Sequence, residues 1–290
     1  MNKLLILSIL SLTIFSNTHA EDLPKCSFWK AVSEYDNCIG EHKYETGSYK
    51  GAYINGVPNG KGQYANEEGE IYIGYFVDFK FEGLGTLQIE SGQKYSGEFK
   101  NGLFHGNGIF EWPDGQKYIG EYLNGKLHGQ GKMTWPDGGT YTGNFKDDFR
   151  HGYGVQKWAD GSIYEGDYLN GVKHGKGEFI FKDGLKYVGD FKDNEMTGSA
   201  KIFFIDGDIY EGDVLNATQH GVGTHIYKSG QIFQGEYLNG KRNGMGKITW
   251  TNGDTSYGSF KDGDRHGSHD YTFADGTKQK VLYDKGKKVD

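Results

Sequence analysis

The fold is decided by one stretch of sequence, which reads Tyr118-Ile119-Gly120-Glu121-Tyr122-Leu123-Asn124-Gly125-Lys126-Leu127-His128-Gly129-Gln130-Gly131-Lys132-Met133-Thr134-Trp135-Pro136-Asp137-Gly138. This pattern returns every 23 residues from Tyr49 onward, in ten copies without insertion or deletion. The repeat positions of Gly120, Gly129 and Gly138 are occupied by glycine in every copy. The repeat position of Gly131 is occupied by another residue in only two copies, at Ala200 and His269. A repeat that conserves its glycines in this way is defined mainly by its backbone.

Each copy carries two turn signals separated by alternating residues. Asn124-Gly125 marks the middle of the copy quoted above and Pro136-Asp137-Gly138 marks its end, so two short strands are expected per copy. Tyr118, Gly120 and Tyr122 alternate with residues that point to the other face. The repeat therefore predicts β-hairpins with one aromatic face.

The quoted pattern resembles the MORN repeat, approximately Tyr-x-Gly-x-(Tyr/Phe)-x-x-Gly-x-x-His-Gly-x-Gly, over residues 49–278. The chain is similar to exported bacterial proteins of that type. The resemblance implies an all-β fold, an elongated single antiparallel sheet of stacked β-hairpins with about two strands per 23-residue repeat. It also implies binding or scaffolding rather than chemistry. A partial eleventh copy lies in the tail, residues 279–290, at Tyr283-Asp284-Lys285-Gly286.

The strictness of the glycines suggests a packing role. A glycine between two aromatic residues leaves a gap in the side-chain row, so that a ring from the neighbouring strand can lie across the backbone. On the opposite face a phase of acidic residues is expected to meet water; it comprises Glu98, Glu121, Asp167, Asp190, Asp213 and Glu236.

The N-terminus has the features of a secretory signal peptide, residues 1–20. Lys3 precedes an apolar run, and Thr18-His19-Ala20 forms a small-residue cleavage site before Glu21. The apolar run is shorter than the roughly 20 residues that span a membrane. We therefore expect an exported protein, periplasmic or extracellular.

The two cysteines, Cys26 and Cys38, are expected to form a disulfide, because an even count in an exported chain favours pairing. Two free thiols or a metal pair are the alternatives, and two thiolates without nearby histidines make a poor zinc site. The disulfide would close an N-terminal cap, residues 21–48, that covers the end of the array.

Catalysis and cofactors are not expected from this sequence. Reactive side chains recur once per repeat instead of converging, and nucleophile-elbow, phosphate-loop and metalloprotease motifs are missing from the sequence. One phase carries histidines about 10 Å apart on a sheet, too far for one metal; we expect them to bond turns or pack against the next hairpin. They are His105, His128, His151, His174, His220 and His266.

The predicted function is a non-enzymatic exported scaffold whose elongated aromatic surface binds a protein. The candidate partner-binding residues are Trp112, Trp135, Trp158 and Trp250, which share one repeat position; the alternative is that most aromatic residues are core. A net charge of −7 disfavours nucleic acid and also disfavours a membrane surface, but association with a lipid or membrane surface is kept as the alternative function. Homodimerisation through the C-terminal end stays open.

Overall fold

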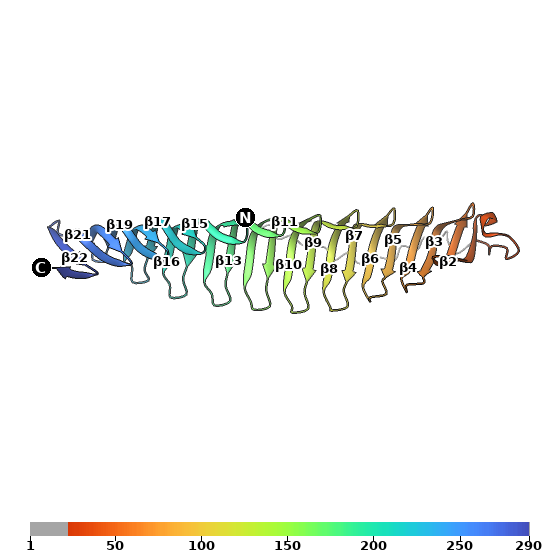
Figure 1. Ribbon diagram of the computed structural model, residues 1–290, viewed down its shortest axis with the longest axis horizontal. Coiled ribbons are helices and arrows are strands. Elements are labelled where there is room, and N and C mark those ends of the chain that lie inside the picture. The colour runs from red at the N-terminus through yellow and green to blue at the C-terminus, as the bar shows by residue number, and fades with distance from the viewer. Residues whose placement is uncertain (1–22, 290) are drawn as a thin grey trace. The chain divides into compact units, whose positions relative to one another are not determined.

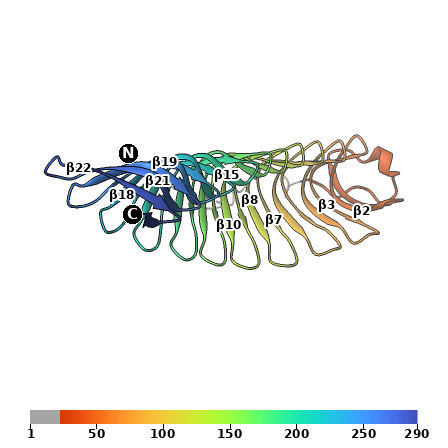
Figure 2. The same cartoon turned by 60° about the vertical axis from the view of Figure 1, so that its left-hand side comes forward.

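The computed structural model describes residues 23–289, which form an all-β structure. Its strands belong to a 23-stranded antiparallel sheet of stacked hairpins that does not close on itself. The expected fold class is confirmed. The chain divides into two compact units, with the boundary in the sequence between Phe104 and His105, and each is described separately. Within each unit the hairpins follow one another in chain order (Figures 1 and 2).

The first unit begins with the 3-10 helix η1 (Val32–Glu34). Its strands are β1 (Cys38–Tyr44), β2 (Gly47–Ile54), β3 (Val57–Asn66), β4 (Ile71–Val77), β5 (Lys80–Gln88), β6 (Lys94–Lys100) and the start of β7 (Leu103–Glu111). Cys26 and Cys38 form a disulfide. The Cys26 amide donates a hydrogen bond to the Ile39 carbonyl at 2.9 Å, so the segment before η1 lies along the free edge of β1.

The second unit continues the same succession of hairpins. Its strands are β8 (Lys117–Leu123), β9 (Lys126–Thr134), β10 (Thr140–Lys146), β11 (Phe149–Lys157), β12 (Ile163–Leu169), β13 (Val172–Ile180), β14 (Lys186–Lys192), β15 (Glu195–Phe203), β16 (Ile209–Leu215), β17 (Thr218–Ile226), β18 (Ile232–Leu238), β19 (Lys241–Thr249), β20 (Thr255–Lys261), β21 (Asp264–Thr272), β22 (Lys278–Asp284) and β23 (Lys287–Val289). Two short strands per repeat agree with the two turn signals.

Nine repeat hairpins contain a β-bulge at the same place. In β8 and β9, Gly120 pairs with Gly131 and the next pair is Glu121 with His128, so β9 carries two additional residues, Gly129 and Gln130. Gly129 has φ +56°, a conformation that side chains with a Cβ rarely adopt. The bulge therefore explains why this phase is glycine in every copy.

The tyrosine rings of the repeat lie directly against a row of glycines, which is called the glycine row. Tyr118 is fully buried, and a Cβ added at Gly131 would lie 2.6 Å from Tyr118 Cζ. A Cβ at Gly120 would meet the same Tyr118 ring. The ring over Gly120 thus comes from two residues earlier in its own strand, and only the ring over Gly131 comes from the neighbouring strand. The sequence predicted a ring from the neighbouring strand over the glycine. This prediction was right for Gly131 and wrong for Gly120.

The tyrosine hydroxyl also satisfies a carbonyl beside the bulge. Tyr118 Oη donates to the Glu121 carbonyl at 3.0 Å, and seven other repeats form the same bond, from Tyr49, Tyr72, Tyr95, Tyr141, Tyr164, Tyr187 and Tyr210. Buried carbonyls need such a partner. The ring position therefore combines apolar burial with one specific hydrogen bond.

The acidic phase has a structural role that the sequence did not reveal. A Glu121 carboxylate oxygen accepts a hydrogen bond from the Gln130 amide at 2.8 Å, within the bulge. Equivalent bonds are formed by Asp167, Asp190, Asp213 and Glu236. These carboxylates do face solvent, but the expectation that they only meet water was incomplete, because they hold the bulge amides.

Candidate functional site

An aromatic edge row runs along the second unit, at the turns that join successive hairpins. It comprises one residue per repeat, and each is half-buried: Trp112, Trp135, Trp158, Phe181, Phe204, Tyr227, Trp250 and Phe273. All four predicted tryptophans belong to the row. The sequence-based analysis missed the four members that are not tryptophan, although their shared repeat position could have identified them.

The turn chemistry fixes each member of the aromatic edge row. The Trp135 amide donates to the Gly139 carbonyl and the Gly138 amide donates back to Trp135. Asp137 Oδ1 accepts from the Gly139 amide at 2.8 Å, the side-chain turn typical of Asp-Gly. Each ring is therefore presented from a rigid turn, which keeps the entropy lost on binding small.

A second row, the roof row, lies over the buried tyrosines of the second unit. It is the repeat position occupied by Leu127, Arg150, Lys173, Met196, Gln219, Arg242 and Arg265. The Arg150 guanidinium lies 5.0 Å from the Tyr168 ring centre and donates to the Gly171 carbonyl at 2.9 Å. Cations here rest on ring faces, where the ring quadrupole attracts them.

Lys173 lies close to four aromatic rings. Its Nζ lies 4.6 Å from the Phe179 ring centre, 5.4 Å from those of Trp158 and Tyr164, and 6.0 Å from that of Phe191. Burial lowers the pKa of the Lys173 ammonium, and the nearby Arg150 guanidinium lowers it further. The aromatic edge row and the roof row thus contact each other at Trp158 and Lys173, and again at Trp250 and Arg265.

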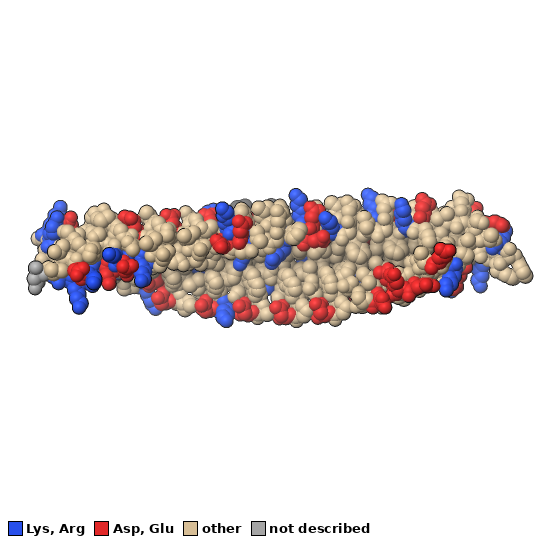
Figure 3. Space-filling model, in the orientation of Figure 1, with Lys and Arg blue, Asp and Glu red and all other residues tan. Residues whose placement is uncertain are grey.

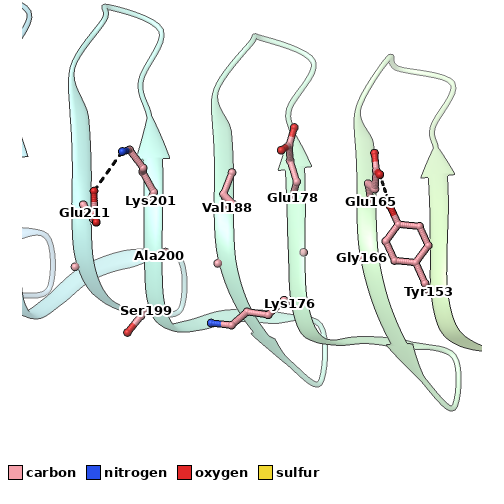
Figure 4. Close-up of a pocket in the computed structure, with 13 residues that line it drawn as sticks. Tyr153, Glu165, Gly166, Lys176, Glu178, Val188, Ser199, Ala200, Lys201 and Glu211 are labelled. Atoms are coloured by element: carbon pink, nitrogen blue, oxygen red, sulfur yellow. Dashed lines mark hydrogen bonds and ion pairs between the residues drawn. The ribbon is translucent and has the colours of Figure 1, made fainter. Parts of the chain in front are cut away.

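The opposite face of the second unit carries an open groove of about 760 Å³ (Figure 4). Its floor includes bare backbone at Gly166 and Gly177, because the Tyr164 side chain covers only the other side of these glycines. Its walls carry both charges, and Lys201 pairs at 3.3 Å with Glu211, which lies opposite it on the neighbouring strand. The groove is thus largely neutralised by its own side chains.

Charged side chains in the view of Figure 3 gather toward the margins of the second unit, where the turns lie. The largest uncharged area in that view lies between those margins.

Within residues 23–289, no group of three or more His, Cys, Asp or Glu side chains lies close enough together to hold a metal ion. In this described part, the Nδ1 atoms of His128, His151 and His220 are buried and form no hydrogen bond. The Nδ1 atoms of these three rings therefore do not bond a turn. His174 Nδ1 lies 3.8 Å from Asp193.

The disulfide loop of the first unit displays two aromatic side chains. Phe28 and Trp29 are 77% and 83% exposed and their ring centres lie 4.3 Å apart. Lys25 and Lys30 flank them in the sequence. Among the described residues, no helix is long and apolar enough to cross a membrane. The predicted signal peptide lies outside the described residues.

A family model described as MORN repeat matches most of the chain, at residues 49–69, 95–117, 118–140, 141–163, 164–186, 187–209, 210–232, 233–255 and 257–278. Residues 70–94 fall between two matches. Their strands β4 and β5 nevertheless form a hairpin with the same bulge and a fully buried tyrosine, Tyr72. Comparison with curated proteins finds no match.

Several solved structures share a low level of similarity with the chain. The Drosophila melanogaster SAS-4 TCP domain, in complex with a proline-rich motif of Ana2, has a TM-score of 0.37 and 8% identity, covering 61% of this chain and 90% of that domain. The Danio rerio CPAP TCP10 domain, in complex with a STIL peptide, has a TM-score of 0.28 and 13% identity, covering 84% and 98%. These scores are too low to carry a function across.

Proposed function

The chain belongs to the MORN repeat family, and we propose that it is a non-enzymatic exported scaffold that binds a protein partner through the aromatic edge row. A repeated aromatic surface fits such a scaffold. The observation that carries the proposal is the uninterrupted succession of half-buried rings at one repeat position, from Trp112 to Phe273. Large aromatic areas of this kind usually mark an interaction site.

The division between core and surface supports this choice. The tyrosines that lie on the glycine row are fully buried and serve the fold. The aromatic edge row keeps part of each ring in solvent, as shown by the intermediate exposure of Trp112, Trp135 and Trp158. Rings that are rigidly held and partly exposed supply contact area at low entropic cost.

The test replaces two neighbouring rings, Trp135→Ser and Trp158→Ser, in the full chain. Proteins of the exported fraction are captured on the immobilised chain and identified by mass spectrometry. We expect one protein to be captured by the unaltered chain and lost from the double variant. A photo-crosslinking residue at position 181 should join that same protein to the chain.

The matched control removes two aromatic side chains from the other face. Tyr153 and Tyr257 are each 51% exposed, and Tyr153→Ser with Tyr257→Ser should leave capture unchanged. Thermal unfolding of both double variants shows whether lost capture reflects lost folding. Equal capture by the folded edge-row variant would contradict the proposal.

Export rests on residues 1–20 and on the disulfide, which is compatible with an oxidising compartment. We propose cleavage before Glu21, a disulfide-closed cap over residues 21–48, and repeats over residues 49–278. Intact-mass analysis of the secreted chain tests the cleavage site and the disulfide. A mature chain that begins at another residue, or that lacks the two-hydrogen mass loss of the disulfide, would contradict it.

A second candidate function, association with a lipid surface, is favoured by Phe28 and Trp29. Exposed aromatic rings beside lysines are typical of side chains that enter the membrane interface. Trp29→Ser should then reduce flotation with vesicles of phosphatidylcholine and phosphatidylglycerol. Unchanged flotation, or none by the unaltered chain, would remove this candidate.

A further inference from the structure

The cations of the roof row are not neutralised by the chain. The sequence has arginine only at positions 150, 242 and 265, and all three belong to this row. Across residues 23–289, neither these arginines nor Lys173 forms an ion pair with a carboxylate. Lysines of the opposite face do form such pairs, for example Lys186 with Glu178 at 2.7 Å.

These cations are held by rings and by backbone carbonyls instead. Arg242 lies 5.1 Å from the Phe260 ring centre and donates to the Gly263 carbonyl at 2.7 Å. Arg265 lies over Trp250 and Tyr283, and its buried Nε forms no hydrogen bond with the described residues. A half-buried cation without a counter-charge is costly, so an anion at this surface would be stabilised strongly.

Acidic side chains near the roof row bond other groups than its cations, and Asp148 accepts a hydrogen bond from the Leu127 amide at 2.8 Å. Asp208 bonds His225 Nε2 at 2.9 Å and the Lys228 amide, and these bonds and the ion pair lower the pKa of the Asp208 carboxyl. It holds a turn rather than a roof-row cation. The positive charge of Arg150, Lys173, Arg242 and Arg265 is thus left for a partner.

The roof row is interrupted at its centre by uncharged residues, and a cavity opens there. Met196 and Gln219 take the places of the cations, and they line a cavity of about 180 Å³ together with Phe181, Ile202 and Phe204. A volume of this order accommodates one leucine or phenylalanine side chain, since a cavity of about 150 Å³ binds benzene.

We infer that the ring face of the second unit binds an extended acidic peptide segment of a partner protein, which pairs with the roof-row cations and inserts one apolar side chain beside Met196. This inference rests on the proposed function, because the segment would lie against the aromatic edge row. Electrostatic complementarity selects the partner, and the cavity supplies an anchor of the kind that dominates binding energy.

The spacing of the row defines the peptide. Roof-row residues in successive repeats lie about 10 Å apart, since each repeat adds two strands. An extended peptide advances about 3.3 Å per residue, so acidic residues three positions apart would match Arg150 and Lys173. Arg242 lies three repeats beyond Lys173 and corresponds to roughly nine residues, with the apolar anchor between them.

The experiment selects ligands from a library of random 16-residue peptides displayed on phage, with the full chain as the target. We expect enrichment of peptides rich in Asp and Glu that carry an apolar residue. A synthetic copy of the best peptide should bind roughly tenfold more weakly to Arg150→Gln and to Arg242→Gln, as expected for a charge-assisted pair. Replacing its acidic residues with lysine should abolish binding to the unaltered chain.

The matched controls are the single variants Lys146→Gln and Lys192→Gln, each of which removes one positive charge from an exposed side chain of the opposite face. These variants should bind the peptide within about twofold of the unaltered chain. Enrichment of neutral or basic peptides, or equal binding by the arginine variants, would overturn the acidic-peptide inference. The lysine-substituted peptide needs no protein variant, so the result does not depend on how an arginine variant folds.

Further outcomes distinguish a failure of the acidic-peptide inference from a failure of the proposed function. Enriched peptides that are not acidic but are lost from Trp135→Ser with Trp158→Ser would overturn the acidic partner and keep the aromatic edge row as the binding surface. Failure to enrich any peptide would count against both. Sedimentation with phosphatidylserine vesicles that depends on Arg150 and Arg242 would assign the cations to lipid and overturn the peptide.

Discussion

At the scale of the residue, the repeat depends on a tyrosine and two glycines that share one space. Tyr118 fills the room that side chains at Gly120 and Gly131 would need. The repeat at Ser256 divides this space in another way: His269 stands at the glycine position, bonds Ser256 Oγ at 3.0 Å and donates through Nε2 to the Ser259 carbonyl at 2.8 Å. The histidine therefore replaces both the ring and the hydroxyl of the tyrosine.

This exchange predicts a rescue. Gly131→His alone should destabilise the protein by about 1–3 kcal/mol, because the imidazole overlaps the Tyr118 ring. The double variant that also carries Tyr118→Ser should have a free energy of unfolding at least about 1 kcal/mol higher than the value expected from adding the two single effects. Urea unfolding of the four proteins measures this coupling, and strictly additive effects would contradict the shared-space explanation.

His269 also predicts a pH dependence. Burial lowers the pKa of its imidazole, so the unfolded chain binds a proton more readily than the folded chain does. The stability from neutral His269 is complete above the unfolded value of about 6.5 and is lost as the pH falls through the lower folded value. Thermal unfolding between about pH 5 and pH 7 should depend less on pH in His269→Gln; an unchanged slope would argue against this role.

At the scale of the element, the hairpin is shaped by its bulge. Two additional residues in the second strand, such as Gly129 and Gln130, interrupt the ladder on one side. The same strand pairs with the following one without a register shift. A carboxylate from the first strand and a tyrosine hydroxyl satisfy the polar groups that the bulge leaves unpaired, so each hairpin is completed by its own side chains.

Removal of the carboxylate should therefore weaken a hairpin. In Asp213→Ala the Val222 amide loses its acceptor, which lies at 3.1 Å, and stability should fall by about 1 kcal/mol. The control is Glu195→Ala, an exposed carboxylate of the same unit, which should change stability by less than about 0.5 kcal/mol. Equal effects in urea unfolding would remove the bulge carboxylate as a stabilising group.

At the scale of the whole molecule, stability is distributed over repeats that each contribute the same kind of contact. Tyr141 packs edge-to-face with Phe145 at 5.1 Å and with Tyr168 of the next repeat at 5.3 Å, and such pairs contribute about 0.5–1.5 kcal/mol beyond burial. Arrays of this type gain stability from neighbouring repeats. Function is distributed in the same way, along rows rather than at one centre.

The buried tyrosines predict alkaline unfolding. Burial raises the pKa of Tyr118, Tyr141 and Tyr164 and raises that of Tyr210 to about 12. Their contribution is complete below the unfolded value of about 10 and is lost as the pH rises through the folded values. Circular dichroism should show unfolding above about pH 10, with a higher midpoint in Tyr164→Phe. Phe233 shows that phenylalanine is accepted at this position, and an unchanged midpoint would contradict the prediction.

The sequence alone determined the repeat, the hairpins, the aromatic face and the candidate tryptophans, because turn residues and alternation are local properties. Only the tertiary structure decided which glycine each ring covers, what Glu121 and its equivalents bond, and why the arginines share one position. Those features arise from contacts between strands. Strand register depends on a bulge that cannot be predicted from any single residue. Tyr118 and Trp135 illustrate the difference: both are aromatic residues of one repeat, yet packing buries the first as core and leaves the second partly exposed as surface.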